Sequence, residues 1–190
     1  MDTNPNYMNQ TDFNRVIAAI PSLKIRKWKD KDIEFLFKIL YHMALRPSEG
    51  IRLNKEDFDI KNRIVYLGKT KTIDKDNTTI PKVFVNELEL YLQTKEQGAL
   101  FPNLRYITFW YWLSKLGEQL QIDPWLRGNR DRTGELTKGH IFRKSWAKDA
   151  IEILGIEKID VISLQLRHSD ILMTMNKYLK ANKKKVHDTI

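Results

Sequence analysis

Two histidines, an arginine and a tyrosine in the last third of the chain have side chains suited to binding and cutting a phosphodiester. His140 and Arg143 are three residues apart, so on a helix they lie on one face and can reach the same group. His168 and Tyr178 follow, and Arg46 lies far upstream. A guanidinium group stays charged and donates two parallel hydrogen bonds to a phosphate. We therefore expect Arg46 and Arg143 to hold the non-bridging oxygens and to stabilise a pentavalent transition state.

Tyr178 is the candidate nucleophile. The pKa of a tyrosine hydroxyl is ordinarily about 10, so attack at neutral pH requires a stabilised phenolate or a group that takes the proton. Nearby arginines and a histidine can supply both. Attack on a DNA phosphate would give a phosphotyrosine ester that conserves the energy of the broken bond, so rejoining would need no nucleotide. Lys69 or Lys71 could donate a proton to the departing deoxyribose oxygen.

Each of these residues taken alone has a simpler structural explanation. A tyrosine most often packs in a core, an Arg-Pro-Ser-Glu segment is typical of a helix start, and a His-x-x-Arg pair usually lies on a solvated face. Asp57 and Asp59 are close in sequence, but a solvated loop explains them. We find no convincing metal-binding cluster in the sequence and predict no cofactor.

The segments that must position these residues are predicted to be mainly helical. Residues 30–45 are expected to form a core helix, because apolar residues cover most of its circumference. Arg46 and Pro47 interrupt it, and proline suits the first turn of a new helix, so a second short helix is expected to start there. Further along, Thr137 is expected to cap the helix of the His-x-x-Arg pair.

A β-hairpin is predicted between these helical parts. Residues 63–68 and 79–85 have the apolar and β-branched composition of two strands, joined by a long polar loop. That loop carries Lys69 and Lys71, and Asn86 is expected to cap the helix that follows. Residues 107–116 predict a helix whose aromatic stripe is more typical of a core than of a platform for stacking bases.

Several basic residues outside these motifs are candidates for contacting DNA phosphates, although a solvated surface would also explain them. Three arginines of this set share the loop after residue 123. For Lys27, the simpler explanation is that it lies in a solvated connector. The candidates are Lys27, Lys71, Arg127, Arg130 and Arg132.

Composition places the chain in a broad class. With 190 residues, 42% hydrophobic and 30% charged residues, it has the profile of a globular protein with one well-packed domain. The sequence contains no long apolar run, no signal-peptide pattern and no cysteine, so we expect a cytoplasmic protein without a membrane span. A net charge of +9 favours a polyanionic partner, but a generically basic surface explains it equally well.

The order of the motifs resembles the catalytic domain of the tyrosine recombinases, the phage-type integrases. That family has an arginine in a Gly-Leu-Arg-x-Ser-Glu setting, a hairpin lysine after glycine, His-x-x-Arg, Leu-Gly-His-Ser, and then the tyrosine. The matching segments here are residues 44–49 (Ala-Leu-Arg-Pro-Ser-Glu), 67–69 (Leu-Gly-Lys), 140–143 (His-Ile-Phe-Arg), 166–169 (Leu-Arg-His-Ser) and Tyr178. The resemblance covers roughly residues 28 to 180.

The resemblance implies a role for each matching residue. Arg46 and Arg143 would activate the phosphate, and Lys69 would be the hairpin general acid, with Lys71 a second candidate. His140 would transfer a proton or bind the phosphate. By the same resemblance, His168 would bind the scissile phosphate or brace the site.

The sequence departs from the family pattern in three places. Arg167 stands where the family usually has glycine before the histidine. The interval from His168 to Tyr178 is one residue longer than the common form, which would shift the presentation of the tyrosine. The separate N-terminal domain that closes around DNA is missing or reduced to residues 1–27. The chain is then either a catalytic-domain fragment or a minimal recombinase that grips DNA with one domain.

We therefore predict a mainly α fold with a small antiparallel β-sheet (α+β), the tyrosine recombinase catalytic-domain fold. Residues 1–27 would be a lead or linker, residues 28–180 the catalytic domain and residues 181–190 a basic tail. The expected function is site-specific DNA recombination or integration through a covalent 3′-phosphotyrosine intermediate, without metal or ATP. Double-stranded DNA is the expected partner, with a homo-oligomer (a tetramer) on DNA and a monomer as the alternative off DNA. The rival functions are a type IB topoisomerase-like enzyme and a non-catalytic DNA-binding protein on the same fold.

Overall fold

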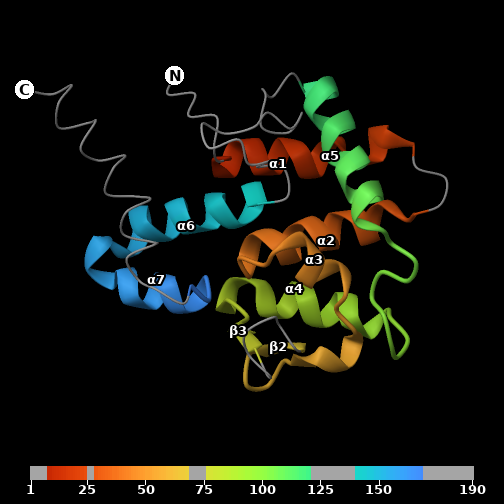
Figure 1. Cartoon of the computed structure of the whole chain (residues 1–190). Coiled ribbons are helices and arrows are strands. Elements are labelled where there is room, and N and C mark those ends of the chain that lie inside the picture. The colour runs from red at the N-terminus through yellow and green to blue at the C-terminus, as the bar shows by residue number, and fades with distance from the viewer. Residues whose placement is uncertain (1–7, 25–27, 69–75, 121–139, 169–190) are drawn as a thin grey trace, which may run out of the picture.

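The computed structural model describes residues 8–24, 28–68, 76–120 and 140–168 (Figure 1). Helices dominate, and three short strands form one sheet. In chain order the elements are α1 (Gln10–Ala19), η1 (Ile20–Leu23), α2 (Asp30–His42), α3 (Pro47–Ile51), η2 (Lys55–Asp57), β1 (Phe58–Asp59), β2 (Ile64–Gly68), β3 (Asp76–Thr79), α4 (Lys82–Gln93), α5 (Tyr106–Leu120), α6 (Ile141–Leu154), η4 (Ile156–Lys158) and α7 (Ile159–Gln165). The predicted mainly α fold with a small antiparallel sheet is confirmed.

Helix α2 is the centre of the hydrophobic core, as its apolar circumference predicts. The Phe37 ring lies 5.7 Å from that of Phe109 in α5 and 5.2 Å from that of Phe142 in α6. On another side of the helix, Phe35 stacks on Tyr91 of α4 with a centroid distance of 3.9 Å. Aromatic side chains thus join α2 to α4, α5 and α6.

Helix α2 ends in a turn that reverses the chain into α3. The Ala44 N–H donates to Tyr41 O (3.3 Å) and the Leu45 N–H donates to Leu40 O (3.2 Å). With Ala44 in the left-handed region at φ +53°, these bonds form a Schellman motif. Helix α3 then starts at Pro47, so the predicted second short helix is confirmed.

The sheet has the order β1-β2-β3 with antiparallel pairing. Val65 of β2 pairs with Phe58 on one side and with Thr78 on the other. A bulge near Tyr66 shifts the register, so that Gly68 pairs with Asp76. Gly68 and Asp76 therefore stand opposite each other where the two strands flank residues 69–75, which lie outside the described residues.

The predicted second strand over residues 79–85 is wrong. The strand is β3, and the apolar residues after Pro81 belong to α4, where Phe84 and Leu88 are buried while Val83 is 87% exposed. Burial of residues four apart is typical of one face of a helix. Pro81 suits the position just before the first helical turn. Asn86 consequently lies inside α4 and does not cap it.

The N-terminal helix α1 packs on the main core. The side chain of Asn9 accepts a hydrogen bond from the Asp12 N–H (2.8 Å) and caps the helix. Phe13 stacks on Tyr41 of α2 at a centroid distance of 4.1 Å, and Val16 is fully buried. This part of the expected lead or linker therefore contributes to the same core as the helices after it.

The predicted aromatic helix is confirmed as α5. Phe109 and Trp112 are buried in the core, whereas Tyr111 and Ile107 are exposed. In the part of the chain that the structure describes, no helix combines the length and apolar character needed to cross a membrane.

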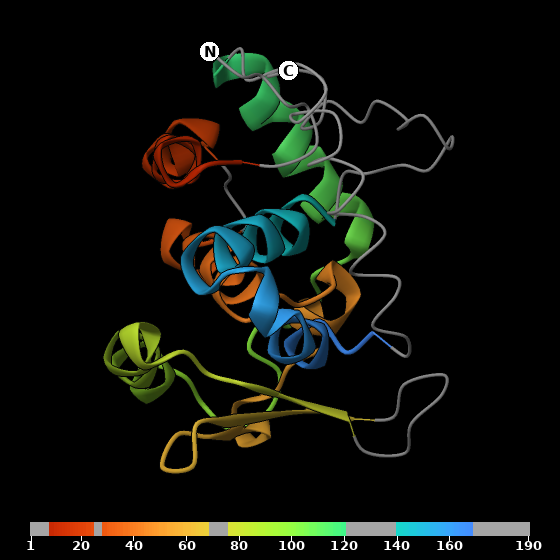
Figure 2. The ribbon, with the colours of Figure 1, turned by 90° about the vertical axis from the view of Figure 1, so that its left-hand side faces the viewer.

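A second, smaller cluster joins α6 to α7. Ala147 and Ala150 of α6 pack with Ile162 and Leu166, and Ala44 from the turn after α2 belongs to the same cluster. Figures 1 and 2 show α7 next to α6. At its C-terminal end, α7 reaches the sheet, because the Gln165 side-chain amide donates to Thr79 O of β3 (3.1 Å).

Candidate active site

Arg46 is held at the start of α3 by a carboxylate three residues later. Its backbone N–H donates to Glu49 Oε2 and its Nη1 donates to Glu49 Oε1, both at 2.7 Å. The Glu49 side chain is 4% exposed, whereas that of Arg46 is 38% exposed. Glu49 thus orients the guanidinium group of Arg46 from the buried side and leaves part of that group accessible.

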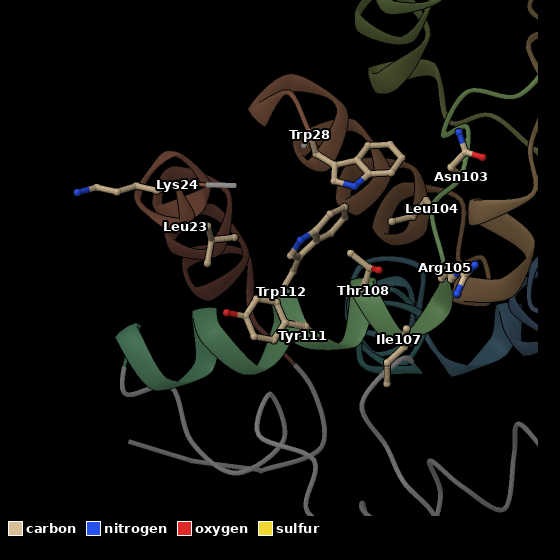
Figure 3. Close-up of a pocket in the computed structure, with 10 residues that line it drawn as sticks. All are labelled: Leu23, Lys24, Trp28, Asn103, Leu104, Arg105, Ile107, Thr108, Tyr111 and Trp112. Atoms are coloured by element: carbon tan, nitrogen blue, oxygen red, sulfur yellow. The ribbon is translucent and has the colours of Figure 1, made fainter. Parts of the chain in front are cut away.

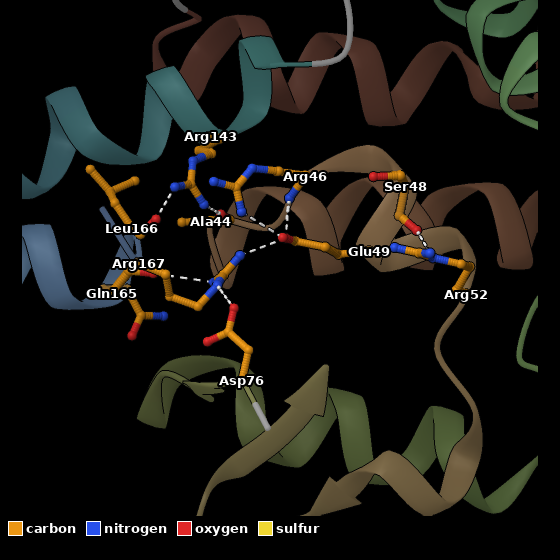
Figure 4. A network of polar contacts seen from close by, with 10 residues as sticks. All are labelled: Ala44, Arg46, Ser48, Glu49, Arg52, Asp76, Arg143, Gln165, Leu166 and Arg167. Carbon is orange, nitrogen blue, oxygen red and sulfur yellow. Dashed lines mark hydrogen bonds and ion pairs between the residues drawn. The ribbon is translucent and has the colours of Figure 1, made fainter. Parts of the chain in front are cut away.

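Arg143 is buried in the first turn of α6 and bridges two turns of the backbone (Figure 4). Its Nη1 donates to Ala44 O at 2.9 Å, and its Nη2 donates to Leu166 O. Ala44 precedes Arg46 by two residues, and Leu166 precedes His168 by two. Arg143 therefore links the chain segments that carry two other candidate catalytic residues.

His168 follows α7 in a second Schellman motif. The Arg167 N–H donates to Leu164 O (2.9 Å) and the His168 N–H donates to Ser163 O (3.1 Å). Arg167 has φ +50°, the left-handed conformation that glycine adopts most readily. The backbone at residue 167 thus explains why glycine suits this place in the motif.

Arg167 is a site residue to which the sequence reasoning gave no role. Its side chain is 5% exposed, and its Nη2 donates a hydrogen bond to Glu49 Oε2 at 2.5 Å. Its Nε lies 3.0 Å from Asp76 Oδ2, and this contact has the geometry of an ion pair rather than of a directed hydrogen bond. Figure 4 shows Arg167 between Glu49 of α3 and Asp76 of β3. The replacement of a glycine by a large charged residue was the sequence signal that could have found it.

The carboxylate of Glu49 is shared by two arginines. Burial by itself raises the pKa of this carboxyl, but the charge of Arg167 and the hydrogen bonds from Arg46 outweigh burial and hold the pKa below its ordinary value. Glu49 is therefore ionised at neutral pH and pairs with Arg46 and Arg167 at once.

His140 lies directly before α6 and is exposed. Arg143, three residues later, is buried, so the two side chains of the His-x-x-Arg pair have different environments. The structure places Arg46, Arg143 and His168 on segments that contact one another. The remaining predicted site residues lie outside the described residues: Lys27, Lys69, Lys71, Arg127, Arg130, Arg132 and Tyr178.

A cavity of about 780 Å³ lies elsewhere, between η1 and α5 (Figure 3). Leu23, Trp28, Tyr111 and Trp112 are among the residues that line it. No candidate catalytic residue of the described segments takes part in this lining.

Three solved structures illustrate what the fold is similar to. The catalytic domain of bacteriophage HP1 integrase is 20% identical, with a TM-score of 0.64 over 94% of this chain and 93% of that chain. XerH site-specific recombinase, bound to palindromic difH substrate in a post-cleavage complex, is 15% identical, with a TM-score of 0.68 over 97% of this chain and 52% of that chain. The Tn1549 transposon integrase in complex with circular intermediate DNA is 13% identical, with a TM-score of 0.64 over 97% of this chain and 68% of that chain.

These likenesses show that the fold is that of tyrosine recombinase catalytic domains. The chain spans about half the length of the XerH chain. No curated protein matches the chain. The family model of the phage integrase family matches residues 6–185. The chain therefore belongs to the phage integrase family, the tyrosine recombinases.

Proposed function

We propose that this protein is a site-specific DNA recombinase or integrase that cuts and rejoins DNA strands through a covalent 3′-phosphotyrosine intermediate, without metal or ATP. The observation that carries the proposal is the link made by Arg143 between the Arg46 turn and the His168 turn. It brings three of the motif segments together, although they are far apart in sequence. The DNA complexes of the XerH recombinase and the Tn1549 integrase support double-stranded DNA as the partner.

The charge of this network suits a phosphodiester. Arg46, Arg143 and Arg167 carry three positive charges, and Glu49 and Asp76 carry two negative ones, which leaves a net charge of +1. Because the two carboxylates are buried behind the arginines, they orient these groups without occupying the exposed part of Arg46. Donors held in place before the reaction stabilise developing negative charge at little reorganisation cost.

In the proposed reaction, Tyr178 Oη attacks the phosphorus atom while Arg46 and Arg143 bind the non-bridging oxygens. The Tyr178 O–P bond forms and the bond from phosphorus to the 5′ oxygen of the next nucleotide breaks. Lys69, with Lys71 as the second candidate, gives a proton to that leaving oxygen. His140 and His168 bind the phosphate or take the proton of Tyr178.

The attack of a 5′-hydroxyl from another strand on the phosphotyrosine ester would reverse this step and rejoin the DNA. Recombination by such exchange requires several protomers on paired sites, so we propose that the protein acts as a homo-oligomer, a tetramer, on DNA.

The test is covalent capture on nicked duplexes. A nick close to the cleavage position lets the short cleaved product diffuse away, so the covalent intermediate accumulates. Since the target sequence is not known, the probe is a pool of nicked duplexes with a randomised central region, incubated with EDTA and no nucleotide. We expect a denaturant-resistant protein–DNA adduct with the wild-type protein, and sequencing of the trapped DNA would give the preferred site.

Tyr178→Phe is the matched control, because it removes the hydroxyl and keeps the ring. We expect this variant to bind DNA with wild-type affinity and to form no adduct. An adduct that persists in Tyr178→Phe would exclude this tyrosine as the nucleophile. Salt-sensitive DNA binding without any adduct from wild-type protein would favour the non-catalytic DNA-binding alternative instead.

A further inference from the structure

Arg167 connects the sheet to the helical turns that carry the candidate catalytic residues. We propose that Arg167 is a positioning residue: it holds the loop end of strands β2 and β3 against the turns of Arg46 and His168, so that the hairpin presents its general acid at the scissile phosphate. This inference rests on the proposed function, but one of its tests does not require activity.

The backbone conformation of Arg167 carries a cost that the contacts of its side chain can offset. A residue with a Cβ atom is disfavoured at φ +50°, and glycine would make the same Schellman turn without strain. Burying an arginine adds the cost of removing a charge from water, which close carboxylates can offset. Arg167 has two of them, Glu49 and Asp76.

The contact with Asp76 is made at the end of the sheet where β2 and β3 flank residues 69–75. Asp76 is the first residue of β3, and its partner across the bulge is Gly68, the last residue of β2. At the other end of β3, Gln165 hydrogen-bonds to the backbone of Thr79. The strand is thus held at one end by Gln165, the last residue of α7, and at the other by Arg167 in the turn after that helix, which makes the contact nearer the segment that carries the candidate lysines.

The contact with Glu49 links Arg167 to Arg46, the residue that we propose to bind the phosphate. Glu49 also binds the backbone and the guanidinium group of Arg46. Asp76, Arg167, Glu49 and Arg46 therefore form an unbroken series of ion pairs from the sheet to the residue that we propose to bind the phosphate. A displacement of the hairpin by about 1 Å could lower the rate of a step that depends on alignment by about 100-fold.

The test compares two leaving groups in single-turnover cleavage. With an ordinary substrate the 5′ oxygen must receive a proton as the P–O bond breaks. With a 5′-bridging phosphorothiolate the P–S bond breaks instead, and the sulfur leaves as a stable thiolate without a proton. If Arg167 acts through the hairpin acid, Arg167→Met should cleave the ordinary substrate about 10- to 100-fold more slowly. Cleavage of the phosphorothiolate should change by less than about threefold, because that substrate does not need general acid catalysis.

Asp76→Asn is the second variant and should give the same selective loss. The double variant should be no slower than the slower single variant, because both substitutions break one contact. Arg167→Lys should recover part of the rate, since it keeps a positive charge near Asp76. Arg15→Met is the matched control, because Arg15 forms an exposed pair with Asp12 on α1, and it should cleave both substrates at the wild-type rate. Equal losses on the two substrates, or additive effects of the two substitutions, would overturn the proposal.

Amide hydrogen exchange tests the same proposal without catalysis. In Arg167→Met and Asp76→Asn, exchange should speed up in Ile64–Gly68 and Asp76–Thr79 and stay unchanged in the helix Lys82–Gln93. Unchanged exchange in both strands would show that Arg167 does not hold the hairpin. If wild-type protein forms no adduct, the proposed function fails, and this exchange measurement still decides whether Arg167 positions the sheet.

Discussion

Replacing Arg167 by glycine restores the usual family residue, but it removes two buried ion pairs while it relieves backbone strain. These effects oppose each other, so their magnitudes decide the sign. An L-residue in the left-handed region costs about 1 to 2 kcal/mol. Glycine loses more conformational entropy on folding, which costs about 0.5 to 1 kcal/mol. The two backbone effects together therefore favour glycine by only about 0.5 to 1 kcal/mol.

The lost charge pairs then dominate. Removal of one partner from a buried pair costs about 3 to 5 kcal/mol, because the remaining charge stays buried without compensation. The Asp76 side chain is 10% exposed and loses its Arg167 contact, while Glu49 keeps Arg46. We expect Arg167→Gly to lower the free energy of unfolding by about 3 kcal/mol.

Urea denaturation followed by circular dichroism would measure this difference. With a slope of about 2 kcal/mol per molar urea, the midpoint should fall by about 1.5 M. Ala44→Gly is the control at the other Schellman turn, where φ is +53° and the Ala44 methyl is fully buried. In Ala44→Gly, the relief of backbone strain is offset by the larger conformational entropy that glycine loses on folding and by the loss of a buried methyl worth about 0.8 kcal/mol. The stability of this variant should therefore be close to that of the wild type. An Arg167→Gly protein as stable as the wild type would refute the idea that the ion pairs outweigh the strain.

Two further predictions concern a half-buried histidine and a buried arginine. Burial lowers the pKa of His42 to about 4 from 6.5, so stability is full above pH 6.5 and falls as the pH drops toward 4, by roughly 3 kcal/mol in total. His42→Phe keeps the stack on Phe84 and should flatten this pH profile of urea midpoints; an unchanged profile would assign the pH dependence to other groups. Arg143→Lys replaces a planar guanidinium, whose Nη1 and Nη2 each reach one of the carbonyls of Ala44 and Leu166, by a single nitrogen, so it should lose about 2 kcal/mol of stability and most adduct formation. A lysine variant that equals wild type in urea denaturation and in covalent capture would contradict the bridging role of Arg143.

Much of the fold could be predicted because its signals are local. The apolar circumference of α2 and the break at Pro47 depend on short stretches of sequence, and both appear in the structure. The β-branched residues after Thr79 misled the strand prediction, because Val83 and Val85 favour strands locally while burial of Phe84 and Leu88 selects a helix. Tertiary packing therefore decided this segment against the local preference.

The order of the motifs identified the candidate residues, but the contacts between these residues could not be predicted from the sequence. The sequence pointed to Arg46, Arg143 and His168 through their spacing and neighbours. It could not reveal that Arg143 binds two backbone carbonyls, because those carbonyls carry no side-chain signature. The role of Arg167 depends on Asp76, which lies on a strand far from it in sequence, so the pair appears only after the chain has folded.

The two Schellman turns also constrain the lengths of the helices before them. Arg46 and His168 each stand a short, rigid distance beyond a helix end, so their directions depend on the last residues of α2 and α7. One residue added to or removed from either helix would rotate the adjoining turn and its candidate catalytic residue by about 100° around the helix axis. Insertions and deletions within α2 and α7 should therefore be as damaging to the site as substitution of the candidate catalytic residues, even where the added residue itself is an ordinary helix former.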